Sequence, residues 1–322
     1  RRETERHATA VHAGGTPALP GDVCLDLTPR RGREILANPK AIDRGECARR
    51  HQEANRMMER RQFLALLAAA PALGKIPVRE AGRVETVFKS PGPYPNGLQA
   101  TDEGLWIIDG EDARAHLVSY RDGTVLRGFD TEAVHPSGIT FDGTAIWVAS
   151  TYSREIIRAD ASSGKTLAKH FTPGAGVIYR MPSDPPGRRS PLAPPPEPAG
   201  ATPAPAQPRP ATGAHGLEWR EGKLWAAVPP SRMIYRIDPE SWIVEQRFPT
   251  IGNRPHGIGW EGSYLWCTDT NLNAFYKHDP KSGEILQKIQ LADDDPLPHG
   301  MTIRDGVLWY CDDVGVVCRL TL

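Results

Sequence analysis

The stretch from Pro255 to Asp269 reads PHGIGWEGSYLWCTD, and a similar stretch, PHGMTIRDGVLWYCDD, runs from Pro298 to Asp313. In each, a short apolar segment is joined by a glycine-containing turn to a second segment with a tryptophan, the pattern of a tight β-hairpin. A motif that recurs within one chain at a period of 20 to 50 residues indicates a solenoid, a propeller or an array.

The hairpin pattern occurs five times, and each copy opens with one variable residue followed by glycine. The variable residues are Asn96, Ser137, His215, His256 and His299, at steps of 41, 78, 41 and 43 residues. Two further apolar segments follow in the first four copies, which gives four antiparallel strands per repeat. About 40 residues and four strands are typical of a β-propeller blade. We therefore expect an all-β, five-bladed propeller.

The last copy stops at Leu322 after three strands, whereas VETVFKS, from Val84 to Ser90, stands before the first copy and has the pattern of a fourth strand. We expect this N-terminal strand to close the last blade. Such closure removes the free sheet edge at the junction of the ring. The propeller domain is thus predicted to span residues 84–322.

The step of 78 residues is interpreted as one blade plus an insertion at 180–214, which is rich in proline, alanine and glycine. This composition predicts an extended or disordered segment. It leaves from the face on which the variable-residue–glycine motifs begin, and it is either a lid or a flexible loop.

Residues 57–72 predict a twin-arginine export signal, because Arg60, Arg61, Gln62, Phe63 and Leu64 precede a short apolar run and small residues follow at a cleavage site. Residues 1–56 are expected to be an untranslated leader, if translation starts at Met57 or Met58, or otherwise a disordered segment. The codons of Gln52-Glu53-Ala54 can contain a ribosome-binding sequence. We expect a periplasmic or secreted protein.

Composition excludes some functions and leaves others open. The formal net charge is zero, so no basic excess predicts nucleic-acid binding. The apolar run near Phe63 is too short for a stable transmembrane helix, so no membrane segment is expected in the mature chain, which we expect to be a monomer. The tryptophans of the hairpins are expected to pack between blades, and Cys267, Cys311 and Cys318 are expected to be buried thiols.

Propeller geometry brings two sets of residues to one face, because the first strand starts where the second strand ends. The first set holds the five variable residues, with histidines in three consecutive blades. The second set, at the end of the second strands, comprises Asp109, Ser150, Val228, Asp269 and Asp312. Imidazoles beside carboxylates suit a metal site or acid–base catalysis. The alternative is structural: each histidine hydrogen-bonds an aspartate or a backbone group and fixes the inner turn of a blade.

The PHGIGWEGSYLWCTD repeat resembles that of virginiamycin B lyase-like and NHL-type propellers, over about Val84 to Leu322. In the lyase, histidines and a glutamate around a magnesium ion open a cyclic lactone-peptide by elimination. That resemblance implies a lyase and draws attention to His215, His256 and His299. LWAAVPPSRMIYRIDPESW, from Leu224 to Trp242, is similar to the strands of five-bladed glutaminyl cyclotransferases, although Ser137 stands where those enzymes have a glutamate. PNGL, with Asp109, resembles gluconolactonase-type propellers.

Two functions follow as hypotheses. The first is a metal-assisted lyase or hydrolase for a small-molecule or peptide ligand, with His215, His256 and His299 as catalytic residues and ligands of a divalent ion (Mg, Ca or Zn). Its expected binding residues are Asn96, Ser137, Asp109, Asp269 and Asp312. The second is a propeller without enzymatic activity that binds a ligand or another protein.

Overall fold

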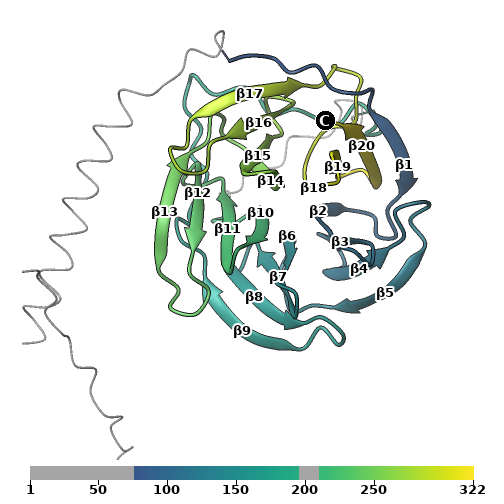
Figure 1. The fold of residues 1–322 in the computed structure, drawn as a ribbon, viewed down its shortest axis with the longest axis vertical. Helices are drawn as coiled ribbons and strands as arrows, with labels where there is room; N and C mark the ends of the chain where they lie inside the picture. Colours follow the sequence, from purple (N-terminus) through teal and green to yellow (C-terminus); the bar gives the residue numbers. More distant parts are fainter. Residues whose placement is uncertain (1–75, 196–209) are drawn as a thin grey trace, which may run out of the picture. The chain divides into compact units, whose positions relative to one another are not determined.

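The computed structural model describes residues 76–195 and 210–322, and over these residues the fold is all-β. The predicted leader at 1–56 and the predicted export signal at 57–72 lie outside the described residues. Twenty strands form five antiparallel sheets of four strands each. The sheets stand around a central axis like the blades of a propeller (Figure 1). The predicted fold and blade number are confirmed.

Four blades are built from consecutive strands. Blade 1 holds β2 (Pro95–Ala100), β3 (Leu105–Asp109), β4 (Arg114–Val118) and β5 (Val125–Asp130). Blade 2 holds β6 (Pro136–Phe141), β7 (Ala145–Ser150), β8 (Glu155–Asp160) and β9 (Thr166–Phe171). Blade 3 holds β10 (Gly216–Arg220), β11 (Lys223–Val228), β12 (Met233–Ile237) and β13 (Val244–Pro249). Blade 4 holds β14 (Pro255–Glu261), β15 (Tyr264–Asp269), β16 (Ala274–His278) and β17 (Ile285–Gln290).

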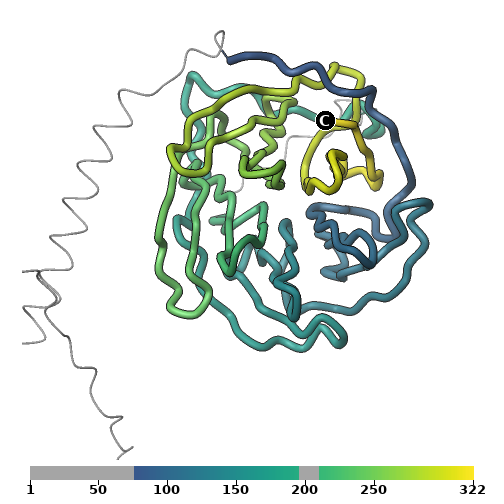
Figure 2. The backbone as a smooth tube through the Cα atoms, in the orientation of Figure 1, coloured from purple at the N-terminus to yellow at the C-terminus, as the bar shows by residue number. Residues whose placement is uncertain are grey.

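Blade 5 combines the two ends of the propeller. Its strands are β18 (Met301–Arg304), β19 (Val307–Asp312), β20 (Val316–Thr321) and β1 (Glu85–Lys89). The N-terminal β1 pairs antiparallel with β20, with Glu85 opposite Arg319. Figure 2 shows the blue start of the domain lying beside the yellow C-terminal segment. The predicted closure is confirmed.

The hydrophobic core lies between neighbouring blades. Each of the five interfaces has one buried cluster, and each cluster contains a tryptophan of the repeat: Trp106, Trp147, Trp225, Trp266 and Trp309. These side chains are at most 5% exposed, which confirms their predicted packing role. Burial of large aromatic surfaces between sheets is a main contribution to the stability of such a ring.

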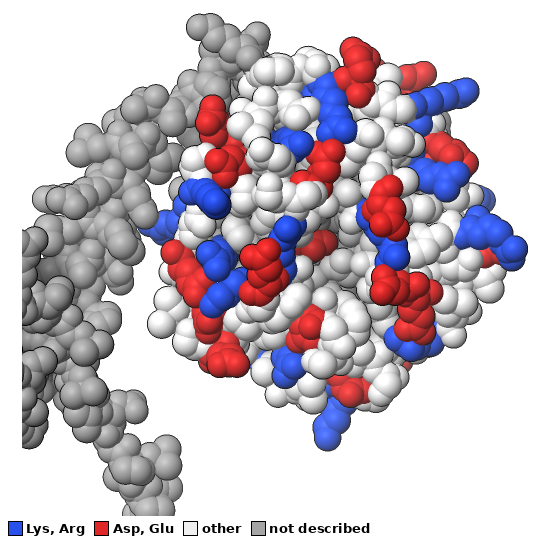
Figure 3. Space-filling model, viewed as in Figure 1, with Lys and Arg blue, Asp and Glu red and all other residues white. Residues whose placement is uncertain are grey.

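The cysteines and the charged side chains of the propeller agree with its sequence composition. Cys267, Cys311 and Cys318 are buried free thiols, as predicted. Basic and acidic side chains are intermingled on the face shown in Figure 3. In the described part of the chain, no helix has the length and apolar character needed to cross a membrane.

Candidate functional site

A ring of glycines explains why every blade opens with a variable residue and then glycine. The first strands approach one another so closely that a Cβ on Gly97 would lie 2.6 Å from the Ser137 carbonyl oxygen of the next blade, and one on Gly300 would lie 2.6 Å from that of Asn96. Contacts this short are sterically forbidden, so only glycine fits. The preceding side chains are therefore gathered at the mouth of the central channel.

The variable residues form two hydrogen-bonded pairs and one separate member. Asn96 donates from Nδ2 to Ser137 Oγ at 2.9 Å. Nδ1 of His215 and Nε2 of His256 lie 3.1 Å apart, and their rings meet edge to face. The ring of His299 also meets that of His256 edge to face, at 4.8 Å between centroids. The structure thus brings the three predicted histidines together on consecutive blades.

Burial keeps these imidazoles neutral. It lowers the pKa of His215 to about 3 and that of His299 to about 4, and it holds the pKa of His256 well below the ordinary value. The Arg254 guanidinium nearby acts in the same direction on all three rings. At neutral pH the rings are hydrogen-bonding groups rather than charges, and they are weak proton acceptors.

The aspartates at the ends of the second strands hold the loops that lead into the channel. Asp109 Oδ2 accepts from the Tyr94 backbone N–H at 2.6 Å, and Asp269 Oδ2 accepts from the Arg254 N–H at 3.0 Å. Asp312 Oδ2 accepts from the Leu297 N–H at 2.6 Å. These contacts give the repeated aspartate a positioning task. Their predicted ligand-binding role stays a prediction.

A third set of residues, not predicted from the sequence, stands two positions before Asn96, Ser137 and His256. These residues are Tyr94, His135 and Arg254, and each precedes a proline. The Asp109 and Asp269 carboxylates hold the backbone N–H of Tyr94 and of Arg254. The signal was present in the repeat itself, because a residue at a fixed distance before each glycine must reach the same face.

Members of the first and third sets line a pocket of about 310 Å³ at the channel mouth. Asn96, Ser137, His215 and His256 contribute to its floor, and the third set contributes all three of its members. His299 and the aspartates of the second strands do not line it. None of the described residues that line the pocket is acidic.

The insertion supplies one wall of the pocket through Arg180, Pro210 and Thr212, together with Ile178 just before it. Its described parts contain no strand, and Gly176, which precedes it, pairs with Thr212 in an isolated bridge. The insertion is anchored to three blades. Arg232 of blade 3 pairs with Asp184 at 2.6 Å, and Asn271 of blade 4 accepts from the Arg188 N–H at 3.3 Å.

The third anchor is the buried hydroxyl of Ser190, which donates to Asp312 Oδ2 of blade 5 at 2.7 Å. The segment from Asp184 to Ser190 therefore crosses the face of the ring next to the pocket. The sequence left a lid or a flexible loop as alternatives for the insertion. These contacts argue against a flexible loop for its described part, which forms a wall of the pocket.

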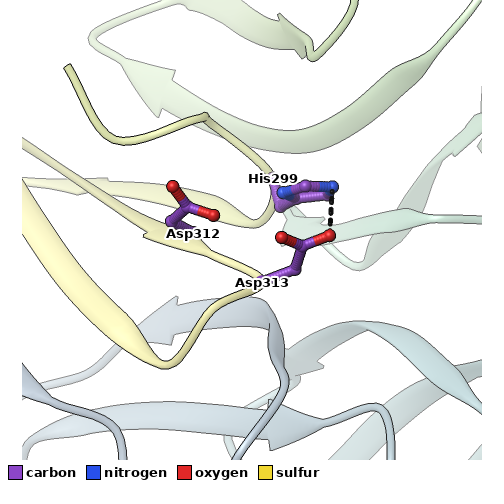
Figure 4. Close-up of side chains that lie close together, drawn as sticks. All are labelled: His299, Asp312 and Asp313. Atoms are coloured by element: carbon purple, nitrogen blue, oxygen red, sulfur yellow. Dashed lines mark ion pairs between the residues drawn. The ribbon is translucent and has the colours of Figure 1, made fainter. Parts of the chain in front are cut away.

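His299, Asp312 and Asp313 come together as a group of metal-ligating residues, with one candidate ligand atom of each within 4.8 Å of the others. Figure 4 shows His299 and Asp313 facing each other, with 3.3 Å between Nε2 and Oδ2. Asp313, which the sequence reasoning did not select, also accepts from the Tyr94 hydroxyl at 3.1 Å. Asp313 follows the aspartate that recurs at the end of the second strands, so it is not at a repeated position of the motif and the repeat did not predict it.

The donor set suits a divalent ion in kind, but several of its atoms already have partners, while Nδ1 of His299 has none. Nη2 of Arg254 lies 3.3 Å from His299 Nε2, the same nitrogen that faces Asp313, so a guanidinium already stands beside this group. Asp312 is engaged by Leu297 and by Ser190. A cation bound at His299 Nε2 would have to displace Arg254. The arrangement therefore does not fit a metal ion bound through Nε2.

The predicted metal site on the three histidines meets a similar obstacle. Two imidazole nitrogens bound to one zinc ion would lie roughly 3.3 Å apart, close to the separation of His215 and His256. A catalytic zinc has three protein ligands, whereas the Nε2 atom of His299 faces Arg254 and Asp313 instead. The described geometry gives two converging nitrogens, so no chemistry is derived through a metal.

A second polar layer lies three residues further along the first strands. It includes Gln99, Thr140, Glu218 and Thr302, all buried. Thr302 donates to Glu218 Oε1 at 3.4 Å, and burial raises the pKa of Glu218 to about 8. This carboxyl is therefore protonated at neutral pH. Sequence reasoning missed Glu218, although its place three residues after His215 could have marked it.

Comparisons with known proteins agree with the fold. No family model and no curated protein matches this chain. Among solved structures, it is similar to glutaminyl cyclase from Myxococcus xanthus, with a TM-score of 0.52 and 11% identity, over 76% of this chain and 98% of that chain. It is also similar to virginiamycin B lyase from Staphylococcus aureus, with a TM-score of 0.42 and 19% identity, over 72% of this chain and 68% of that chain.

A streptogramin B lyase structure gives a TM-score of 0.42 and 15% identity, over 75% of this chain and 98% of that chain. The expected resemblance to glutaminyl cyclotransferases is confirmed at the level of the fold. Identities this low say nothing about activity, because one fold carries many unrelated functions.

Proposed function

We propose that this propeller binds a small organic ligand in the pocket at the channel mouth and acts on it as a lyase or hydrolase. The volume of about 310 Å³ lies within the range of small-molecule pockets. Its walls come from several blades and from the insertion, so the site depends on the assembled ring.

One observation carries the proposal. Nε2 of His215, Nδ1 of His256 and Oδ1 of Asn96 are buried polar atoms without a hydrogen-bond partner in the protein. An unsatisfied buried polar group costs about 1 to 3 kcal/mol, so such atoms call for a bound partner. All three belong to side chains that line the pocket.

The chemistry of these groups favours reactions in which a substrate oxygen gains negative charge. A neutral imidazole can donate a hydrogen bond to such an oxygen, and the Arg254 guanidinium stabilises the charge electrostatically. Elimination and hydrolysis both pass through such a stage. Because the lowered pKa values make the histidines weak bases, we assign them stabilisation of charge rather than proton abstraction.

A propeller that binds the same ligand without reacting with it is the alternative. The low pKa values of the histidines favour it, since binding needs hydrogen bonds and no proton acceptor. The enzyme and the binding propeller would use the same pocket, and only the enzyme would convert the bound ligand into a product.

A ligand screen tests the proposal. Thermal-shift measurements with a library of small metabolites should give compounds that raise the melting temperature of the wild type and lose this effect in His256→Gln. His170→Gln, on the outer strand β9, is the matched control and should respond like the wild type. Mass spectrometry of each hit after incubation then separates turnover from binding. Hits that act equally on His256→Gln, or a screen without hits, would contradict the proposed site.

Export of the folded chain to the periplasm or the exterior, with residues 57–72 as signal, belongs to the same proposal. The arginine pair Arg60-Arg61 before the apolar run supports it. Sequencing the N-terminus of the protein recovered from the native host tests it. A mature protein that retains residues 1–56 would overturn both the signal and the leader.

A further inference from the structure

We infer that the ligand of this pocket is a carboxylate with an apolar or aromatic body, and that Arg180 of the insertion and Arg254 of blade 4 hold its charged group. This inference rests on the proposed function, because it names the class of ligand for the same pocket.

The charges around the pocket support an anion. Arg180 and Arg254 line it, and no described lining residue is acidic. Within the described part of the chain, no ion pair joins either guanidinium to a carboxylate, whereas Arg232, next to the insertion, is paired with Asp184. Two carboxylates at this face of the ring already have other partners. Asp313 contacts His299 and Tyr94, and Asp269 accepts backbone N–H groups. A guanidinium that is not paired with a carboxylate of the protein can bind one from a ligand well, because its two N–H groups match the two oxygens.

Contacts of the insertion place Arg180 at the pocket. The guanidinium of Arg232 binds the Tyr179 carbonyl at 2.9 Å as well as Asp184, on either side of Arg180. Gly187 leaves room for the Arg180 side chain, because a Cβ atom on residue 187 would lie only 3.1 Å from Arg180 Nη2. The insertion therefore carries a positive group to the rim of a pocket whose other walls come from the blades.

An aromatic wall completes the site. His135 stacks on Tyr152 with ring centroids 4.7 Å apart and an angle of 7°, and Tyr94 packs on His135 at 5.5 Å. His135 has a φ of 51°, a conformation that is strained for a residue other than glycine and is enriched at functional sites. All three rings line the pocket, so they offer aromatic surface to the carbon skeleton of the ligand.

Calorimetric titration with three matched probes tests the inference: phenylacetate, its neutral amide phenylacetamide, and the cation phenethylammonium. We expect phenylacetate to bind about tenfold more tightly than the amide, a difference of about 1.4 kcal/mol, and the cation to bind least. Arg180→Gln should remove most of this preference, and Arg180→Lys should keep part of it. Arg121→Gln, an exposed arginine paired with Asp122, is the control and should behave like the wild type.

The outcomes separate this inference from the proposed function. Equal affinity for phenylacetate and its amide would overturn the inference and leave a pocket for neutral ligands. A preference that persists in both Arg180→Gln and Arg254→Gln would also overturn it, because the anion would then be bound elsewhere. If none of the three probes binds, the inference is wrong, while the metabolite screen with His256→Gln still decides whether the pocket binds a ligand.

Discussion

His215 and His256 share one hydrogen bond, with 3.1 Å between Nδ1 of the first and Nε2 of the second. Burial keeps both rings neutral, and one of the two nitrogens must donate while the other accepts, so the two tautomers are coupled. The outer nitrogens, Nε2 of His215 and Nδ1 of His256, are left without partners. A ligand that binds one of them selects the tautomer of both rings.

The buried histidines should make the protein unstable in acid. The unfolded chain takes up protons below pH 6.5, whereas His299 resists protonation until about 4 and His215 until about 3. Stability is therefore present above pH 6.5 and is lost as the pH falls, by about 3 kcal/mol for His299 alone. Urea unfolding across this window should show a smaller loss in His299→Gln than in the wild type. Equal losses would indicate that acid destabilisation arises elsewhere.

Glu218 should have the opposite effect, because its contribution to stability falls as the pH rises from 4.5 to about 8. Its pKa is about 8 in the folded protein and 4.5 in the unfolded chain, so the folded state keeps a proton that the unfolded chain loses. Stability from this group is present below pH 4.5 and declines by up to about 5 kcal/mol as the pH rises through 8. Glu218→Gln stays neutral and should flatten this decline in urea unfolding, whereas the exposed control Glu240→Gln should not. A decline that persists in Glu218→Gln would show that the carboxyl ionises with little cost.

The repeat was sufficient to predict the fold, because hairpin register and the glycine after each variable residue fix which side chains face the channel. It also placed His215, His256 and His299 side by side. It did not single out Arg254, whose distance from His299 depends on how two blades pack. Arg180 was out of reach for another reason: its place is set by Arg232 and Gly187, contacts that no local pattern encodes.

The metal predicted from the sequence can be measured directly. Because Arg254 lies beside His299 Nε2 and only two histidine nitrogens converge, we expect protein purified without chelator to hold well below one equivalent of zinc, calcium or magnesium. Arg254→Gln removes the competing charge and should raise divalent-ion affinity at His299, Asp312 and Asp313. Elemental analysis and titration of both proteins check this. One firmly bound equivalent in the wild type, lost in His299→Gln, would restore the metal site.

The N-terminal strand β1 should be indispensable to the ring, although it is the strand farthest in sequence from the rest of its blade. Phe88 of β1 is 8% exposed and lies in the cluster that joins blade 5 to blade 1, together with Leu98, Trp309 and Val317. Phe88→Ala should cost about 3 to 5 kcal/mol of unfolding free energy, since it leaves a cavity at that interface. Lys89→Ala, an exposed neighbour on the same strand, is the control and should cost little.

Deleting residues 84–90 should go further, because it also exposes the edge of β20 and favours association between molecules. Thermal unfolding and light scattering measure both effects, and a deletion variant that melts and scatters like the wild type would show that the ring does not depend on this strand.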